Sequence, residues 1–583
     1  MADQNGRLYV VRKFKRNGAA IRMGMNLKHT SLLYSNEAWL LPPKPRACWN
    51  ANGLYDPLQF VLRLRPDVHA ELDSAPNGVV TLQELSSEQV LAFSTYFHEN
   101  IHWWQHVGSV TGLFLSLIYP AQAHLNHEYL KRILSTLGPV KPLRSHNLRM
   151  ASLPTNGPRL DEDMNIVLNN WHDMEFYRWL VMDPRGVADK LTDPFFDCVG
   201  HSYKVAVCAI LWCLSAIVDP QLEILPDPRQ WDARAAELRQ KKVEGFYRGS
   251  PIWLPPIGAR EIFEGQARFS QLQYLYATSG CSVTWEDCGK GGLLGDIYIR
   301  AFLEFLAISG LERPSALDDP IIGLFLIICD IAINPAECCV YGIDDVATLV
   351  EKHDCGHRFI MLCNAVRLDR NYFATAIVSY SPEEYWNVEE RLCDGAKLIS
   401  QKRLLRKIES WHTQGSRVGA LVDEDRTFRF VEDNLPVRVF LARFLRLQRD
   451  RSRHPEFFCW PGIWMTTIRT GALTIDDAQL LFKEHEALFV DDADGDVYPR
   501  TFTNRDEKDV KKVFDDFYLW VATYDLTRQW IVGEGKFDFD FGWLTSKYAD
   551  SEMKEWVSRA FVSMYGVSPD EFEVVSGVSG NEQ

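Results

Sequence analysis

The 583-residue chain has no long uninterrupted apolar run, no excess of basic residues and no regular cysteine spacing. Its apolar runs at 205–218 and 321–333 are shorter than the roughly 18 residues of a membrane-spanning helix, so we expect buried helices and no membrane span. The start MADQNGRLYVVRKFKRNG lacks the apolar centre of a signal peptide. Thirteen cysteines, an odd number, follow no disulfide framework. Together these absences predict a reducing, cytoplasmic setting.

The charge balance is acidic, with a formal net charge of -15. Binding to nucleic acid requires clustered Lys and Arg that neutralise phosphates, so we expect no nucleic-acid partner. The most basic stretch, 438–453, interleaves arginines with apolar residues at helical spacing. This pattern indicates a helix with one packed and one solvated face.

Helical periodicity dominates the chain after residue 85, whereas short strand-like runs separated by turn residues occupy the first 85 residues. We therefore expect a mainly α (α+β) fold with a small β-containing N-terminal part. The length favours three parts: 1–85, a metal-binding helical domain at 86–310 with an insertion around 139–255, and a helical C-terminal region at 311–583. Ten helices are predicted, at 87–118, 163–182, 199–218, 229–245, 258–279, 293–309, 318–332, 382–412, 432–453 and 505–531.

One predicted helix carries the sequence HENIH at residues 98–102. Ser86 and Gln89 form a capping-box pattern at its start. Because each helical residue turns by about 100°, His98 and His102 lie on nearly the same side of the helix. Thr95, Gln105 and Ser109 extend this polar stripe, and a separate apolar face is formed by Phe93, Phe97, Ile101 and Trp104.

HENIH matches the pattern HExxH, in which two His bind Zn²⁺ and the intervening Glu takes a proton from water. The pattern predicts His98 and His102 as metal ligands and Glu99 as the catalytic base. A cluster of hydrogen-bonded polar residues without a metal is the alternative. His106 is a candidate for orienting water or substrate, or simply a packed side chain, because no Gly bends the chain before it as in metzincins.

A catalytic zinc needs a third protein ligand. Glu264 lies on the predicted helix at 258–279, and we expect the small residues Gly265 and Ala267 to let this helix approach the His-bearing one closely. Glu128, Glu175, Glu261 and a ligand other than Glu remain open alternatives.

The motifs HENIH and EGQA (264–267) together resemble those of the gluzincins, a family of HExxH metallopeptidases whose third ligand is a Glu on a later helix. The resemblance implies a zincin-like catalytic core and a zinc metalloprotease that hydrolyses peptide bonds in a protein or peptide substrate. It also implies Glu264 as the third ligand and residues 79–85 as an edge strand that pairs with the substrate. The block from His98 to Gln105, followed by Thr111-Gly112, is also similar to uncharacterised bacterial HExxH proteins.

Three other residues are candidates for contacting the substrate in such a site. Tyr298 and Tyr274 are candidate donors to an oxyanion, or core aromatics. Arg268 is a candidate for binding a substrate carboxylate, or for an ordinary helical ion pair with Glu264. The predicted metallopeptidase is compatible with a selective intracellular protease or effector, and with a regulatory protein partner. The alternative function is a non-catalytic scaffold that keeps HExxH as a structural metal site or polar cluster.

Three further patterns are weaker metal signals. A second, structural zinc would use His353, Cys355, His357 and Cys363, but the spacing matches no common module. The acidic turn at 491–496 lacks the Gly position and closing Glu of an EF-hand. A di-iron bundle would pair Glu99 and His102 with Glu409 and His412.

Overall fold

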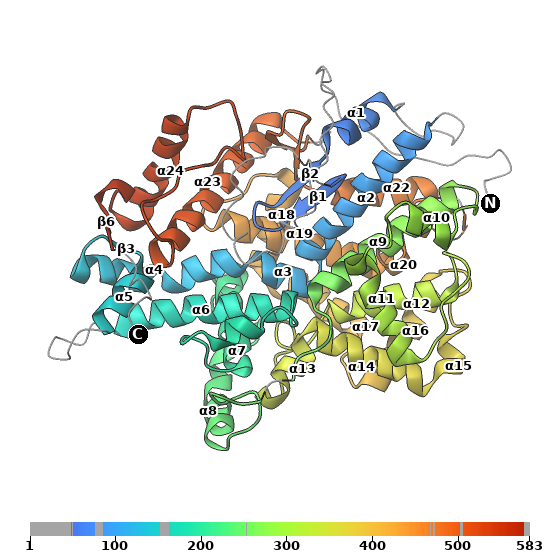
Figure 1. Cartoon of the computed structure of the whole chain (residues 1–583), viewed down its shortest axis with the longest axis horizontal. Helices are drawn as coiled ribbons and strands as arrows, with labels where there is room; N and C mark the ends of the chain where they lie inside the picture. The colour runs from blue at the N-terminus through green and yellow to red at the C-terminus, as the bar shows by residue number, and fades with distance from the viewer. Residues whose placement is uncertain are drawn as a thin grey trace.

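The computed structural model describes residues 48, 51–75, 85–151, 162–251, 253–466, 468–469, 471, 473–501 and 505–575. Of the described residues, 66% lie in helices and 4% in strands, which confirms the expected mainly α fold with a small β part. Figure 1 shows the helices surrounding a short sheet, with the helix that carries HENIH next to that sheet.

The first half of the described chain contains eleven α-helices, and their order follows the sequence closely. Their bounds are α1 Pro66–Ser74, α2 Ser87–Gly108, α3 Val110–Ser116, α4 Ile118–Leu137, α5 Leu143–Ala151, α6 Glu162–Met182, α7 Val199–Val218, α8 Asp232–Gln240, α9 Ala259–Thr278, α10 Trp285–Lys290 and α11 Asp296–Ser309.

The second half adds thirteen described α-helices. Their bounds are α12 Pro320–Ala332, α13 Leu349–His353, α14 Cys355–Leu368, α15 Arg370–Phe373, α16 Pro382–Ala396, α17 Gln401–Gln414, α18 Ser416–Thr427, α19 Leu435–Arg453, α20 Pro455–Cys459, α21 Pro461–Trp464, α22 Ile475–His485, α23 Glu507–Ile531 and α24 Asp550–Tyr565.

Four short strands form the main sheet, in the order β1-β2-β4-β5. β1 (Gly53–Asp56) pairs antiparallel with β2 (Val61–Leu64), which pairs in parallel with β4 (Phe489–Asp491). β4 then pairs antiparallel with β5 (Val497–Pro499), and a second sheet joins β3 (Val140–Lys141) to β6 (Glu573–Val574). Strands from both ends of the chain therefore meet, and the buried apolar residues form one cluster from Tyr55 to Phe572. The division into three parts stays a prediction.

Several predicted elements agree with the structure and others do not. The helices predicted at 163–182, 199–218 and 258–279 match α6, α7 and α9 to within one residue. The helix predicted at 382–412 is interrupted, because Lys397 adopts a left-handed conformation after α16 and Ser400 caps α17. α18 lies in a stretch where no helix was predicted. Of the first 85 residues, 1–47, 49–50 and 76–84 lie outside the described residues, so the predicted edge strand at 79–85 is described only at residue 85.

The helix predicted at 87–118 is also interrupted, at Ser109. This residue has an extended backbone, its Oγ donates to the carbonyl of Gln105 (2.6 Å), and the same oxygen accepts from the N–H of Gly112 (2.9 Å). A short polar side chain that bonds nearby backbone groups thus ends α2 and caps α3. Gly112 then packs directly on the last turn of α2, where a Cβ would lie 1.8 Å from the Gln105 carbonyl oxygen.

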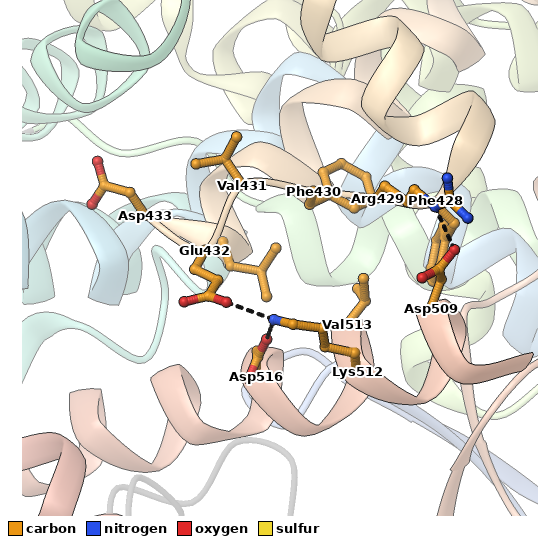
Figure 2. A pocket seen from close by; sticks show the side chains of 11 residues that line it. Phe428, Arg429, Phe430, Val431, Glu432, Asp433, Asp509, Lys512, Val513 and Asp516 are labelled. Carbon is orange, nitrogen blue, oxygen red and sulfur yellow. Dashed lines mark hydrogen bonds and ion pairs between the residues drawn. The ribbon is translucent and has the colours of Figure 1, made fainter. Parts of the chain in front are cut away.

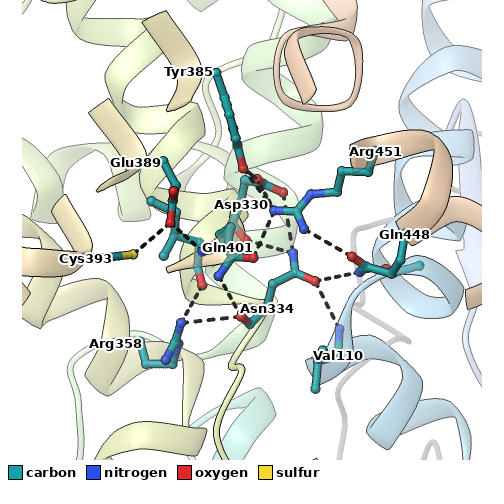
Figure 3. Close-up of polar contacts among 12 residues, drawn as sticks. Val110, Asp330, Asn334, Arg358, Tyr385, Glu389, Cys393, Gln401, Gln448 and Arg451 are labelled. Atoms are coloured by element: carbon teal, nitrogen blue, oxygen red, sulfur yellow. Dashed lines mark hydrogen bonds and ion pairs between the residues drawn. The ribbon is translucent and has the colours of Figure 1, made fainter. Parts of the chain in front are cut away.

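A buried polar network holds this break in place (Figure 3). The Gln448 amide donates to the carbonyl of Gly108 (2.6 Å) and to Asn334 Oδ1 (3.1 Å), which also accepts from the N–H of Val110 (3.3 Å). Arg451 donates to Gln448 Oε1 (3.2 Å) and forms an ion pair with the buried Asp330 (2.6 Å). The backbone groups exposed by the break are therefore satisfied by α19 and by the segment after α12.

α7 is the one described helix that is long and apolar enough to cross a membrane by length and composition. Within its most apolar window, 67% of the residues are buried inside the fold, where α7 packs against α4 and α6. A core helix passes the same test, so the finding is weak evidence for a span.

Replacing Gly112 by Ala should destabilise the fold by roughly 3 kcal/mol, because the new Cβ would meet backbone that has no room to move. Denaturant unfolding of the purified chain measures this change. The matched control is Gly419→Ala in α18, where nothing lies within 4 Å of the added Cβ. That control should gain about 0.5–1 kcal/mol through helix propensity. Equal stability of the two variants would contradict this account of the break.

Candidate metal centre

Polar side chains form a buried seam between α2 and α9, which pack closely along their lengths. In one direction along α2, Ser94 meets Gln271, His98 and His102 meet Glu264, and Gln105 meets Gln266. Ser94 near the start of α2 meets Gln271 late in α9, whereas Gln105 near the end of α2 also donates to the carbonyl of Phe263 early in α9, so the two helices run antiparallel. Two of the four pairings use a glutamine side chain, Gln271 with Ser94 and Gln105 with Gln266.

His98, His102 and Glu264 form a three-residue cluster at the centre of the seam. Glu264 Oε2 lies 3.5 Å from His98 Nε2 and 3.3 Å from His102 Nε2, and the two imidazole nitrogens are 3.1 Å apart. One ligand atom from each residue lies within 4.8 Å of the other two, and this is the one such group found among the described residues. The structure therefore brings together the three residues predicted as metal ligands.

Gln105 orients the imidazole of His102. The Gln105 amide nitrogen donates to the carbonyl of Phe263 and to Gln266 Oε1, each at 2.9 Å, so its Oε1 is the atom that faces His102 Nδ1 at 2.8 Å. An oxygen at that position accepts a hydrogen bond, which assigns an N–H to Nδ1 and leaves Nε2, the atom that faces Glu264 and His98, as the nitrogen available to a metal. This is the tautomer and orientation that a metal-binding imidazole needs.

The donor set fits a divalent cation. Glu264 Oε2 is buried and faces the two imidazoles, so its charge needs either a proton on one of them or a bound cation. Burial raises the pKa of Glu264, but the two histidines outweigh this effect and hold the pKa well below its usual range. Burial and the charge of Arg268 lower the pKa of His98 to about 3, so its imidazole is neutral. Imidazole nitrogens and a carboxylate are ligands that zinc prefers.

The pKa of His102 is shifted in the opposite direction to that of His98. Burial lowers the pKa of His102, but the neighbouring Glu264 raises it by more, so that the pKa reaches about 9. In the protein without metal, a proton on His102 therefore compensates the charge of Glu264. A bound cation would replace this proton, as metal binding at histidine sites generally does.

Glu99 lies beside the cluster and against the sheet. Burial raises the pKa of Glu99 to about 7, against the opposing charges of His102 and Arg268. β1 approaches so closely that a Cβ at Gly53 would lie 2.7 Å from Glu99 Cγ. The absence of a side chain at position 53 thus makes room for the predicted catalytic base, and no sequence signal pointed to this glycine.

Tyr298 and Arg268 border the cluster on the side of α11. The Tyr298 ring centroid lies 6.1 Å from that of His98, and the Arg268 guanidinium lies over the Tyr298 ring at 3.9 Å. Burial raises the pKa of Tyr298, and Glu264 raises it further. Tyr274 instead packs on Phe93 and Phe97 in the aromatic core.

His106 and the rival carboxylates lie outside the cluster. The His106 ring packs between Tyr55 and Phe263, and burial lowers its pKa to about 3. Of the rivals, Glu128 is exposed on α4, Glu175 forms an ion pair with Arg178, and Glu261 accepts from the N–H of Gly258 at the start of α9.

The expected role of Gly265 is wrong. A Cβ at this position would meet Phe325 in α12 and Ala301 in α11, so the glycine lets α9 approach those helices rather than α2. The reason is geometric, because position 265 is turned by about 100° from Glu264 on the helix. Ala267 is fully buried.

Of the weaker metal patterns, none brings its residues into a ligand group within the described part of the chain. His353 bonds the Tyr177 hydroxyl, and His357 bonds Asp354. In the acidic turn, Asp494 and Asp496 accept hydrogen bonds from Tyr498 and Ser546, so these carboxylates already have protein donors.

All thirteen cysteines are free thiols, as expected for a chain without a disulfide framework.

A cavity of about 470 Å³ lies elsewhere, between α23 and the segment that joins α18 to α19 (Figure 2). Within it, Lys512 pairs with Glu432 and Asp516, and Arg429 pairs with Asp509. The cavity has no lining residue from α2 or α9, so it is separate from the cluster.

Sequence reasoning missed three polar residues of the seam: Ser94, Gln266 and Gln271. Gln271 donates to Ser94 Oγ (3.0 Å) and accepts from Arg268, as Gln266 accepts from Gln105. A signal was present, because Glu264, Arg268 and Gln271 recur at helical spacing and mark a polar face on α9.

Comparison with protein-family models, with curated proteins and with solved structures finds no match to this chain. The likeness to gluzincins therefore rests on the two short motifs and the geometry between them. Membership of that family stays a prediction.

Removing a ligand side chain should remove the metal. We expect the purified chain, after incubation with Zn²⁺ and desalting, to retain about one ion per chain, and His98→Ala and Glu264→Ala to retain little. Elemental analysis measures the bound zinc. Glu128→Ala, at an exposed carboxylate on α4, is the control and should retain the metal. Equal zinc content in all four proteins would contradict the assignment.

Gln105→Leu should weaken zinc binding by roughly 10- to 100-fold, because the variant loses the group that orients His102 but keeps all three ligands. Competition with a chromophoric chelator gives the affinity. Gln240→Leu, at an exposed position at the end of α8, provides the matched control. Unchanged affinity in a folded Gln105 variant would show that the orientation of His102 does not depend on this amide.

Proposed function

We propose that the chain is a zinc-dependent metallopeptidase that hydrolyses peptide bonds. The observation that carries this proposal is the convergence of His98 and His102 from α2 with Glu264 from α9, with Glu99 beside them. The three ligand atoms fit the His₂Glu donor set of catalytic zinc sites.

The chain's own residues would act as follows. His98, His102 and Glu264 hold the ion, and Gln105 keeps His102 in its binding tautomer. Zinc, when bound, supplies a Lewis acid that polarises a carbonyl group and acidifies water. Glu99 accepts a proton from the attacking water and passes it to the leaving amine. The close approach of β1 at Gly53 restricts the position of the Glu99 side chain during both transfers.

The number of ligands favours catalysis over a purely structural metal site. Structural zinc sites usually have four protein ligands, whereas catalytic sites have three and keep one position open. Among the described residues the cluster offers three. The Glu264 side chain also remains 12% exposed, which supports access for a small reactant from solvent. The alternative is a non-catalytic scaffold in which the same residues form a polar or structural metal cluster.

The substrate is proposed to be a protein or an extended peptide. The strand expected to pair with it, at 79–85, lies almost entirely outside the described residues. The thirteen free thiols support action in a reducing, cytoplasmic compartment. A regulatory protein partner remains part of the proposal.

Glu99→Gln should reduce peptide hydrolysis by roughly 100- to 10,000-fold while zinc content and melting temperature stay unchanged. The amide keeps the size of the side chain but accepts no proton from water. Mass spectrometry of a mixed peptide library incubated with the zinc-loaded chain measures cleavage, and Glu128→Gln serves as the control. Cleavage that persists in the Glu99 variant, or its absence from the zinc-loaded wild-type chain, would favour the non-catalytic alternative.

A further inference from the structure

Arg268 is a buried cation that lacks a carboxylate partner. Its side chain is 8% exposed, and the described residues supply no ion pair to it, so the expected helical pair with Glu264 does not form. One guanidinium nitrogen donates to the neutral Gln271 side chain, and Nε is buried without a hydrogen-bond partner. Burying an arginine in this way is costly unless an anion reaches it.

Neighbours on α2, α9 and α11 fix the position of Arg268. Gln271 donates its amide nitrogen to Ser94 Oγ on α2, so its Oε1 is the atom that faces the guanidinium. The ring of Tyr298 lies below the guanidinium, at 3.9 Å from its carbon. A cation–π contact offsets only part of the free-energy cost of burying an unpaired charge.

Arg268 also lies close to the cluster. It is one helical turn after Glu264, and the Tyr298 ring that it covers lies 6.1 Å from His98. Its charge lowers the pKa of His98 and of Glu99, as expected for a cation near both groups. A substrate carbonyl at the cluster would therefore place its neighbouring groups near the guanidinium.

With a divalent ion bound, the charges around the site would not balance without another anion. The carboxylates of Glu264 and Glu99 together would neutralise the ion. Arg268 would then be the uncompensated charge of the site. A guanidinium presents paired N–H donors that match a carboxylate.

On the basis of the proposed peptidase function, we propose that Arg268 binds a carboxylate of the substrate and selects peptides that carry one next to the scissile bond. This carboxylate is either the free C-terminus, which would make the chain a carboxypeptidase, or an acidic side chain. In both cases Arg268 determines specificity, and it takes no part in proton transfer.

The test uses the full-length, zinc-loaded Glu99→Gln chain, which should bind peptides without cleaving them. Acetylated tripeptides are offered in three forms: with a free C-terminus, with a C-terminal amide, and with a C-terminal amide but an acidic last residue. Affinity-selection mass spectrometry ranks the three forms, and calorimetry gives the dissociation constants. We expect a carboxylate-bearing form to bind roughly 10- to 100-fold more tightly than the neutral amide.

The same measurements are made on Arg268→Gln and Arg268→Lys in this background. Arg268→Gln should reduce the preference to less than about threefold, and Arg268→Lys, which keeps the charge, should restore part of it. Arg260→Gln, which alters an arginine near the start of α9 that pairs with Asp183, is the matched control and should keep the full preference. Melting temperatures and zinc content identify any variant that is misfolded or has lost its metal.

The outcomes separate this proposal from the proposed function. The proposal is overturned if no form binds, if carboxylate and amide forms bind equally, or if the preference survives in a folded Arg268→Gln chain. A preference that depends on Arg268 in a protein whose wild-type form cleaves no peptide would retain the carboxylate site and reject the peptidase. Cleavage by the wild-type chain without any carboxylate preference would retain the peptidase and reject the carboxylate site. The free-terminus and acidic-residue forms show which carboxylate is bound.

Discussion

The polar seam between α2 and α9 is the constraint on which the candidate site depends. Buried polar groups need partners, and here each helix supplies the partners of the other: Gln271 for Ser94, Glu264 for the two histidines, and Gln266 for Gln105. A shift of either helix by one turn would break all of these pairings together. The seam therefore fixes the relative position of two helices that lie far apart in the sequence.

The surroundings hold α2 at both ends and along two flanks. A capping box at Ser86 and Gln89 satisfies its first turn, and Gln448 and Asn334 satisfy the break after Gly108. On one flank, Phe93 and Phe97 pack on Phe482 of α22. On another, β1 contacts Glu99 directly. Rigid support of this kind is what a metal site requires, because ligand positions must hold to within fractions of an ångström.

Both functional proposals follow from the groups that the seam leaves incompletely compensated. The charge of Glu264 is compensated by a proton on His102 alone, and Arg268 has no carboxylate partner among the described residues. One is an anion that faces two imidazoles, and the other is a cation one turn away on the same helix. A cation bound by Glu264 and an anion bound by Arg268 would compensate both charges. A bound metal ion together with an acidic peptide group would supply this combination.

The sequence by itself determined the features that depend on local pattern. The capping box located the start of α2, the four-residue spacing placed His98 and His102 on one side, and periodicity predicted a mainly helical fold. Only the tertiary structure decided which carboxylate meets the histidines, which helices Gly265 approaches, and that Ser109 interrupts the long helix. Local periodicity reports which side of its own helix a residue occupies. It carries no information on which distant segment packs against that side, because packing is decided by the whole core.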